Sequence, residues 1–148
     1  MKKYQRQTIL EYIPKTFKVE KDVNPSRIYE YNQKKIKSKT IIYLCEREMR
    51  TKDNFALQFA LNKMKKYNLD FKIVFPRFQC SNLNKQDFLN KQLEFTKNSL
   101  ENINITFFEI INPINYLLNN PPAILIIDFN PLLNRSWIKN LSSKMFSN

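Results

Sequence analysis

The feature that most constrains the fold of this sequence is the alternation of short apolar runs with longer segments of helical periodicity. Four runs rich in β-branched and aromatic residues predict strands, at residues 40–45, 70–75, 105–110 and 123–127. Segments with apolar residues near helical spacing follow them, at residues 54–67, 86–101, 113–118 and 135–145. The first and last strands are continuously apolar, as is typical of strands buried on both faces. The order β-α-β-α-β-α-β-α predicts an α/β fold with a parallel sheet and helices on both faces.

Local signals set the expected ends of these elements. Pro76 has no N–H for a ladder and should stop the second strand, and Pro113 suits the first position of a short helix. Thr51 or Asp53 is placed to cap the first long helix. The sequence contains no glycine, so the glycine-rich fingerprint of dinucleotide-binding folds is absent.

The chain divides into a basic arm over residues 1–39 and an α/β domain over residues 40–148. The arm shows no sustained period, contains Pro14 and Pro25, and carries 11 basic against 4 acidic residues, so we expect it to be largely irregular. The net charge of +12 invites a nucleic-acid partner. Because the chain is also crowded with Asn, Lys, Ile, Phe and Tyr, we favour compositional drift over a dedicated DNA-binding face. Only weak, sequence-independent DNA binding through residues 1–39 is expected.

Composition also excludes several classes of site. The chain has no histidine, and Cys45 and Cys80 are far apart with no CxxC pair, which argues against zinc sites and against Ser-His or Cys-His catalysis. Both cysteines are expected to be small buried apolar residues. No apolar run approaches the roughly 20 residues that span a bilayer. We therefore expect a soluble, intracellular protein without a membrane partner.

Two segments carry a resemblance to a known family. Residues 43–57, YLCEREMRTKDNFAL, resemble the opening of class II cyclobutane-dimer DNA photolyases, where a strand runs into an arginine-rich turn and an Asp-Asn-aromatic-Ala-Leu helix start. Residues 128–132, DFNPL, followed by Arg135, Trp137 and Ile138, look like the family's Asp-Phe-Ser-Pro-Leu turn with its following Arg, Trp and aliphatic residue. The similarity covers about residues 40–142.

The resemblance implies a Rossmann-like N-terminal domain, in some members holding a light-harvesting antenna. In the family a larger helical domain follows, which binds FAD and flips the thymine dimer out of the duplex. We therefore expect a truncated DNA-repair domain of about four parallel strands that stops before the family's fifth strand. It should carry no catalytic residue, need no cofactor by itself except a possible antenna chromophore, and be inactive unless a separate chain supplies the FAD domain.

A second hypothesis is a non-enzymatic basic α/β module that binds DNA or a repair partner, or a decayed gene product. A neighbouring reading frame that encodes an FAD-binding helical domain would favour the photolyase half, in other words a split gene.

In a sheet of order 3-2-1-4, ligands favour the crevice beside strands 1 and 4, where the chain reverses direction. Glu46, Arg47, Arg50 and Asp128 are expected there and are the candidate floor of an antenna or interdomain cleft. The alternative that we favour is an Arg–Asp ion pair, made by Arg47 or Arg50 with Asp128, that orders two loops.

The remaining conspicuous residues have simpler interpretations. Asp53 and Asn54 should cap a helix, and Trp137 should pack rather than transfer electrons. Residues 7–13 faintly resemble a sliding-clamp peptide, but Ile13 and the proline after it stand where two aromatic residues belong. Residues 123–127 should form an apolar sheet edge that invites a partner strand.

Overall fold

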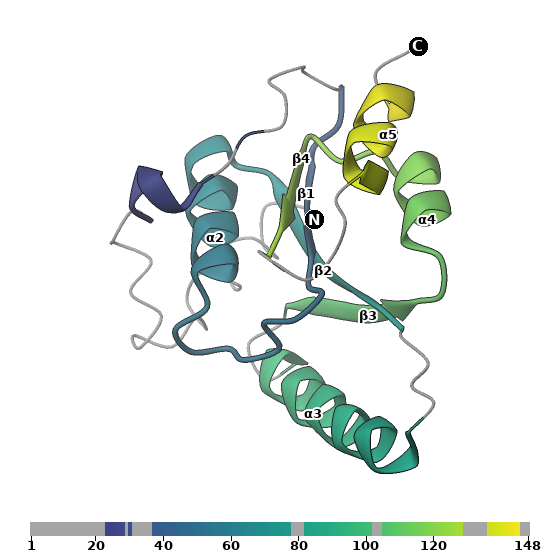
Figure 1. Cartoon of the computed structure of the whole chain (residues 1–148). Helices are drawn as coiled ribbons and strands as arrows, with labels where there is room; N and C mark the ends of the chain where they lie inside the picture. Colours follow the sequence, from purple (N-terminus) through teal and green to yellow (C-terminus); the bar gives the residue numbers. More distant parts are fainter. Residues whose placement is uncertain are drawn as a thin grey trace.

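The computed structural model describes residues 23–28, 30, 37–77, 82–101, 105–128 and 136–145. Its elements, shown in Figure 1, are η1 (Pro25–Arg27), β1 (Thr40–Leu44), α2 (Phe55–Tyr67), β2 (Asp70–Pro76), α3 (Leu83–Glu101), β3 (Thr106–Ile110), α4 (Pro113–Asn119), β4 (Ile124–Ile127) and α5 (Ser136–Met145). The sequence-based boundaries of the four strands and of α2 to α5 differ from these by at most three residues. The expected alternation of strands and helices is therefore confirmed.

The strands form one parallel sheet in the order β3-β2-β1-β4, as expected. β1 lies in the middle and pairs with β2 from Thr40 opposite Asp70, and with β4 from Ile41 opposite Ile124. β3 completes the other side by pairing with β2. The first strand of the domain is thus one of its two inner strands, and the last strand lies directly beside it.

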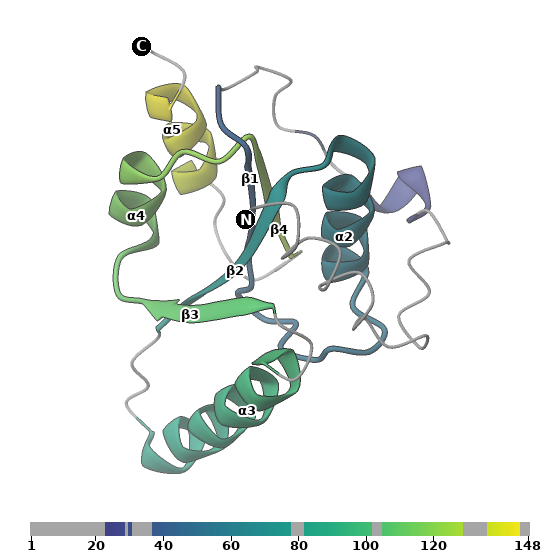
Figure 2. The ribbon, with the colours of Figure 1, turned by 180° about the vertical axis from the view of Figure 1, so that it is seen from behind.

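Helices cover both faces of the sheet. Successive residues of a strand point to opposite faces, so each strand contributes to the packing on both sides. One core lies under α2 and α3. It includes Ile41 and Tyr43 of β1 and Cys45, the residue that follows the strand. Ile42 and Leu44 pack on the other side with α4 and α5. Figure 2 shows the same separation from behind, with α4 and α5 together on one side of the sheet and α2 on the other. The two hydrophobic clusters make β1 almost completely buried.

β2 includes Pro76 as its last residue, so the strand ends one residue later than expected. The reason lies in the alternation of ladder bonds. Val74 accepts from Cys45 on the β1 side, whereas Arg77 donates to Ile110 on the β3 side, at 2.8 Å. Pro76 therefore turns its missing N–H toward the β1 side, beyond the last paired residue of that strand.

Of the expected arm, the structure describes residues 23–28, 30 and 37–39. Within these residues η1 is a single turn of 3-10 helix, Val23 is buried, and Arg27 lies over the ring of Phe55 in α2. This part of the arm packs on the domain. None of the helices in the described ranges is long and apolar enough to cross a membrane.

Candidate functional site

The carboxyl ends of β1 and β4 meet at Asp128, which follows β4 and is only 5% exposed. Its Oδ1 accepts a hydrogen bond from the backbone N–H of Glu46 at 2.8 Å. Its Oδ2 accepts from the N–H groups of Arg47 and Glu48, at 2.7 and 2.6 Å. One carboxylate thus holds three successive residues of the loop between β1 and α2, at the point where the chain reverses direction across the sheet.

The favoured ion pair between Asp128 and an arginine is wrong. In the described structure neither Arg47 nor Arg50 forms a salt bridge with Asp128, and the exposed guanidinium of Arg50 instead pairs with Glu48, Nε to Oε2 at 2.9 Å. A buried carboxylate can be satisfied by backbone N–H groups without the cost of desolvating a guanidinium. The structure does bring Glu46, Arg47 and Asp128 together, but through the main chain of the loop.

Three converging N–H groups form a nest, a backbone arrangement that binds anions such as phosphate in other proteins. Here the anion is the side chain of Asp128. A nucleotide phosphate would have to displace a carboxylate that makes three short, charge-assisted bonds. The N–H groups of residues 46–48 are therefore already occupied by the protein itself and do not fit the phosphates of a flavin dinucleotide.

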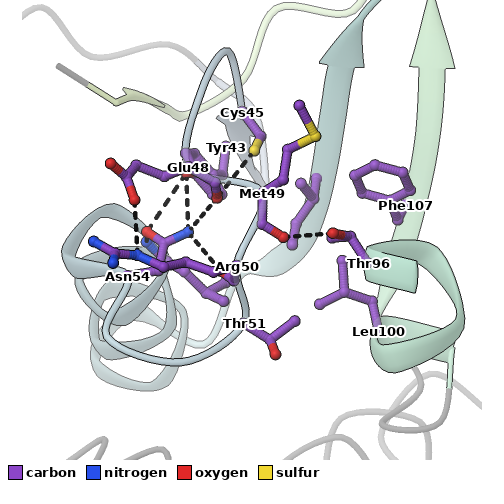
Figure 3. A pocket seen from close by; sticks show the side chains of 12 residues that line it. Tyr43, Cys45, Glu48, Met49, Arg50, Thr51, Asn54, Thr96, Leu100 and Phe107 are labelled. Carbon is purple, nitrogen blue, oxygen red and sulfur yellow. Dashed lines mark hydrogen bonds and ion pairs between the residues drawn. The ribbon is translucent and has the colours of Figure 1, made fainter. Parts of the chain in front are cut away.

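Asn54 organises the other end of the same loop. Its Oδ1 accepts from the N–H of Leu57 at 2.9 Å, which caps the N-terminus of α2. Its Nδ2 donates to the carbonyl groups of Glu48 and Arg50, at 2.8 and 3.1 Å. The same nitrogen lies 3.2 Å from the hydroxyl oxygen of Tyr43 in β1 (Figure 3). A single buried amide therefore ties together the strand, the loop and the helix.

The capping role predicted for Asn54 is confirmed, but Thr51 and Asp53 do not cap the helix. Asp53 has a φ of 52°, a left-handed conformation that non-glycine residues rarely adopt. It supplies the sharp turn that delivers Asn54 to the helix end. Sequence spacing does not distinguish between neighbouring candidates for a helix cap. The backbone conformation determines which of them caps the helix.

Tyr43 and Cys45 are the titratable groups buried beneath this loop. Burial raises the pKa of the Cys45 thiol to about 12, and the nearby carboxylate of Asp128 adds to the effect. Burial also raises the pKa of Tyr43 well above its ordinary value. Both groups are neutral at pH 7, so Cys45 is not a thiolate nucleophile. Cys45 is a free, buried cysteine as expected, whereas Cys80 lies outside the described residues.

A cavity of about 10 Å³ lies between the loop and α3 (Figure 3). Its lining comes from β1, the loop, α2, β2, α3 and β3: Tyr43, Cys45, Glu48, Met49, Arg50, Thr51, Asn54, Leu57, Ile73, Thr96, Leu100 and Phe107. This volume is about that of one water probe, so an antenna chromophore does not fit in it. Thr96 of α3 closes one side, since its hydroxyl donates to the carbonyl of Met49 at 2.5 Å.

Thr96 lies in the helix predicted at residues 86–101, but its role as a loop anchor was not predicted. The available signal was its polarity, because a hydroxyl on a buried helix face needs a partner. Several other predictions fall on residues that the structure leaves undescribed. These are residues 7–13, the motif residues 129–135, and the side chain of Trp137.

A scan against protein-family models finds no match to this chain, and a search of curated proteins finds no significantly similar sequence.

Proposed function

We propose that this chain is the α/β domain of a class II photolyase-like DNA-repair protein and that its role is to dock to a flavin-binding helical domain. The observation that carries the proposal is the contact between the two family-like segments. Asp128 opens the second segment, and its carboxylate binds the loop residues 46–48 of the first segment. The first residue of the second motif thus anchors the loop of the first motif at the reversal point of the sheet.

The chemistry of the described residues favours a docking role over catalysis by this domain. The thiol of Cys45 and the phenol of Tyr43 are protonated at pH 7, and the adjoining cavity has room for about one water. In the proposed assembly the helical domain holds FAD and supplies the light-driven electron transfer. Residues 40–128 supply a rigid sheet against which that domain packs.

β4 offers a docking edge for the partner. Ala123 donates its N–H to Thr40 of β1 at 2.8 Å, and ladder bonds alternate along a strand. The N–H groups of Leu125 and Ile127 therefore also point to β1, while those of Ile124 and Ile126 point away from it. No strand within the described residues pairs with that outer side. A wholly apolar strand with a free edge is a template for an added strand.

Co-expression with a chain that carries both the fifth strand and the flavin-binding helical domain of a class II photolyase tests the proposal. The two chains should co-purify, the complex should repair cyclobutane dimers in light, and amide exchange at Ile124 and Ile126 should slow. Ile124→Pro removes an outward N–H at the first position of β4 and should abolish the association. Ile124→Val keeps that N–H and is the matched control. If the helical domain neither co-purifies nor slows exchange at these two residues, the docking role is wrong.

A second candidate is a basic binding module, favoured by the excess of positive charge in residues 1–39. Arg27, Lys37 and Lys39 of this arm are exposed where the structure describes it. Binding of this type would be sequence-independent and steeply salt-dependent. It would need no flavin domain, so the co-expression experiment separates it from the docking role.

A further inference from the structure

The outer side of α2 carries a regular stripe of aromatic and basic residues. Phe55, Phe59, Lys63 and Tyr67 follow one another at intervals of four residues, which places them on one side of the helix. At a rise of 1.5 Å per residue the stripe is about 18 Å long. η1 lies beside this helix on the side away from the sheet (Figures 1 and 2). Phe55 of the stripe and Arg27 of η1 thus lie on one surface.

Cations lie over the rings along the whole stripe. The guanidinium carbon of Arg27 is 4.4 Å from the ring centroid of Phe55. Lys63 Nζ lies 4.9 Å from the centroid of Phe59 and 5.6 Å from that of Tyr67. Lys66 Nζ is also 5.6 Å from Tyr67. We call these six residues, Arg27, Phe55, Phe59, Lys63, Lys66 and Tyr67, the α2 stripe.

Among the described residues, no salt bridge offsets the positive charge of the stripe. α2 has three lysines and no acidic residue, and none of the salt bridges between described residues involves Arg27, Lys63 or Lys66. The cation–π contacts hold these charges in place without neutralising them. Two of the three rings are accessible as well, since Phe55 is 47% exposed and Tyr67 is 50% exposed, whereas Phe59 packs partly against the core. The surface therefore offers fixed cations and half-open ring faces within one helix length.

We infer that the α2 stripe binds a single-stranded nucleic acid, with phosphates on Arg27, Lys63 and Lys66 and bases stacked on the exposed rings. Cations interleaved with aromatic faces are the combination by which proteins hold single strands without reading sequence. In a duplex the faces of the bases are buried in its own stack. The carboxylates of an acidic peptide would bind the cations but would not stack on the rings. The inference goes beyond the proposed docking role, because it involves a different surface and needs no flavin domain.

Fluorescence anisotropy of the full chain with labelled oligo(dT), over a series of salt concentrations, tests the charge component. Lys63→Gln combined with Lys66→Gln should weaken binding about tenfold at low salt. It should also reduce the slope of log K against log salt by about 1.4, since each single-strand phosphate contact contributes about 0.7. Lys91→Gln combined with Lys97→Gln is the control, because it removes the same charge from α3. The control should bind like the wild type.

Tyr67→Leu and Phe55→Leu test the stacking component. Each should weaken oligo(dT) binding about fivefold or more while leaving the salt slope unchanged. All the substituted side chains are at least partly exposed, and far-ultraviolet circular dichroism verifies that each variant is folded.

The inference is wrong if the wild type does not bind oligo(dT) at low salt, or if the α2 and α3 double variants bind it equally. It is also wrong if the matching duplex binds equally or more tightly. α2-dependent binding of phosphatidylserine vesicles without binding of oligo(dT) would contradict it as well. Loss of flavin-domain docking with intact oligo(dT) binding would contradict only the proposed function.

Discussion

α2 and α3 cover the same face of the sheet, yet they are held there in different ways. The buried residues of α2, Leu57, Ala60, Leu61 and Met64, extend over most of its length. Those of α3, Leu93, Thr96 and Leu100, lie only in its C-terminal half, although α3 is the longer helix. The start of α2 is also fixed by Asn54 and, through the preceding loop, by Asp128. α2 is therefore anchored at its N-terminus, whereas α3 packs on the core only through its C-terminal half.

The two helices also differ in the partners of their charged side chains. α3 has three lysines and three acidic residues, and two of its lysines pair with a carboxylate one turn away, Lys91 with Asp87 and Lys97 with Glu101. The lysines of α2 have no acidic residue in their own helix, and Lys63 and Lys66 lie over aromatic rings. The same residue type is paired with carboxylates on one helix and, among the described residues, forms no salt bridge on the other. A net charge taken from composition does not reveal this difference.

The largest effect is expected when the carboxylate that fixes the start of α2 is removed. Asp128→Ala leaves three backbone N–H groups without their acceptor, and we expect a loss of about 4 kcal/mol in the free energy of unfolding, measured with urea. Asp128→Asn keeps one carbonyl oxygen and should lose about half as much. An unchanged stability for Asp128→Ala would mean that the loop does not depend on this contact and that α2 is no better anchored than α3.

The caps of the two helices give a direct comparison at one residue type. Asn54→Ala removes a buried cap and the two bonds to loop carbonyl groups, so it should cost about 2.5 kcal/mol. Asn82 accepts from the N–H of Lys85 at 3.2 Å in an exposed setting, and Asn82→Ala should cost only about 0.5 kcal/mol. Equal losses in matched urea titrations would remove the distinction between the two helix starts.

The last effect is absent at neutral pH, appears only in alkali and concerns the buried thiol on the α2 side. Cys45 has a raised pKa of about 12 in the fold, so the native state keeps a proton that the unfolded chain loses above about pH 9. Its contribution to stability is complete below that pH and should fall by up to about 1.4 kcal/mol per pH unit toward pH 12. Cys45→Ala should make the unfolding free energy correspondingly less dependent on pH. Cys80→Ala is the comparison variant, and identical alkaline slopes for wild type and Cys45→Ala would contradict the prediction.

The sequence was sufficient for the order of the strands and for the meeting of Asp128 with the loop after β1. The order is the one implied by the resemblance to Rossmann-like domains, and the meeting follows from that order and the rule that parallel strands end at one edge of the sheet. It was not sufficient for the partner of Asp128, because a carboxylate can accept from a guanidinium or from backbone N–H groups, and the loop dihedral angles decide which. The choice of Asn54 over Asp53 as the cap depends in the same way on a single positive φ. The spacing of the α2 stripe is visible in the sequence, but the positions of its cations over the rings depend on rotamers.

The place of β4 beside β1 has a consequence for the timing of synthesis. Ile124 pairs with Ile41, although it leaves the ribosome 83 residues later. At about 5–20 residues per second this interval is roughly 4–17 s, far longer than the formation of a helix or hairpin. During that time one side of β1 is open to any other extended segment. The nascent chain therefore exposes an unpaired strand edge for several seconds, until its own fourth strand arrives.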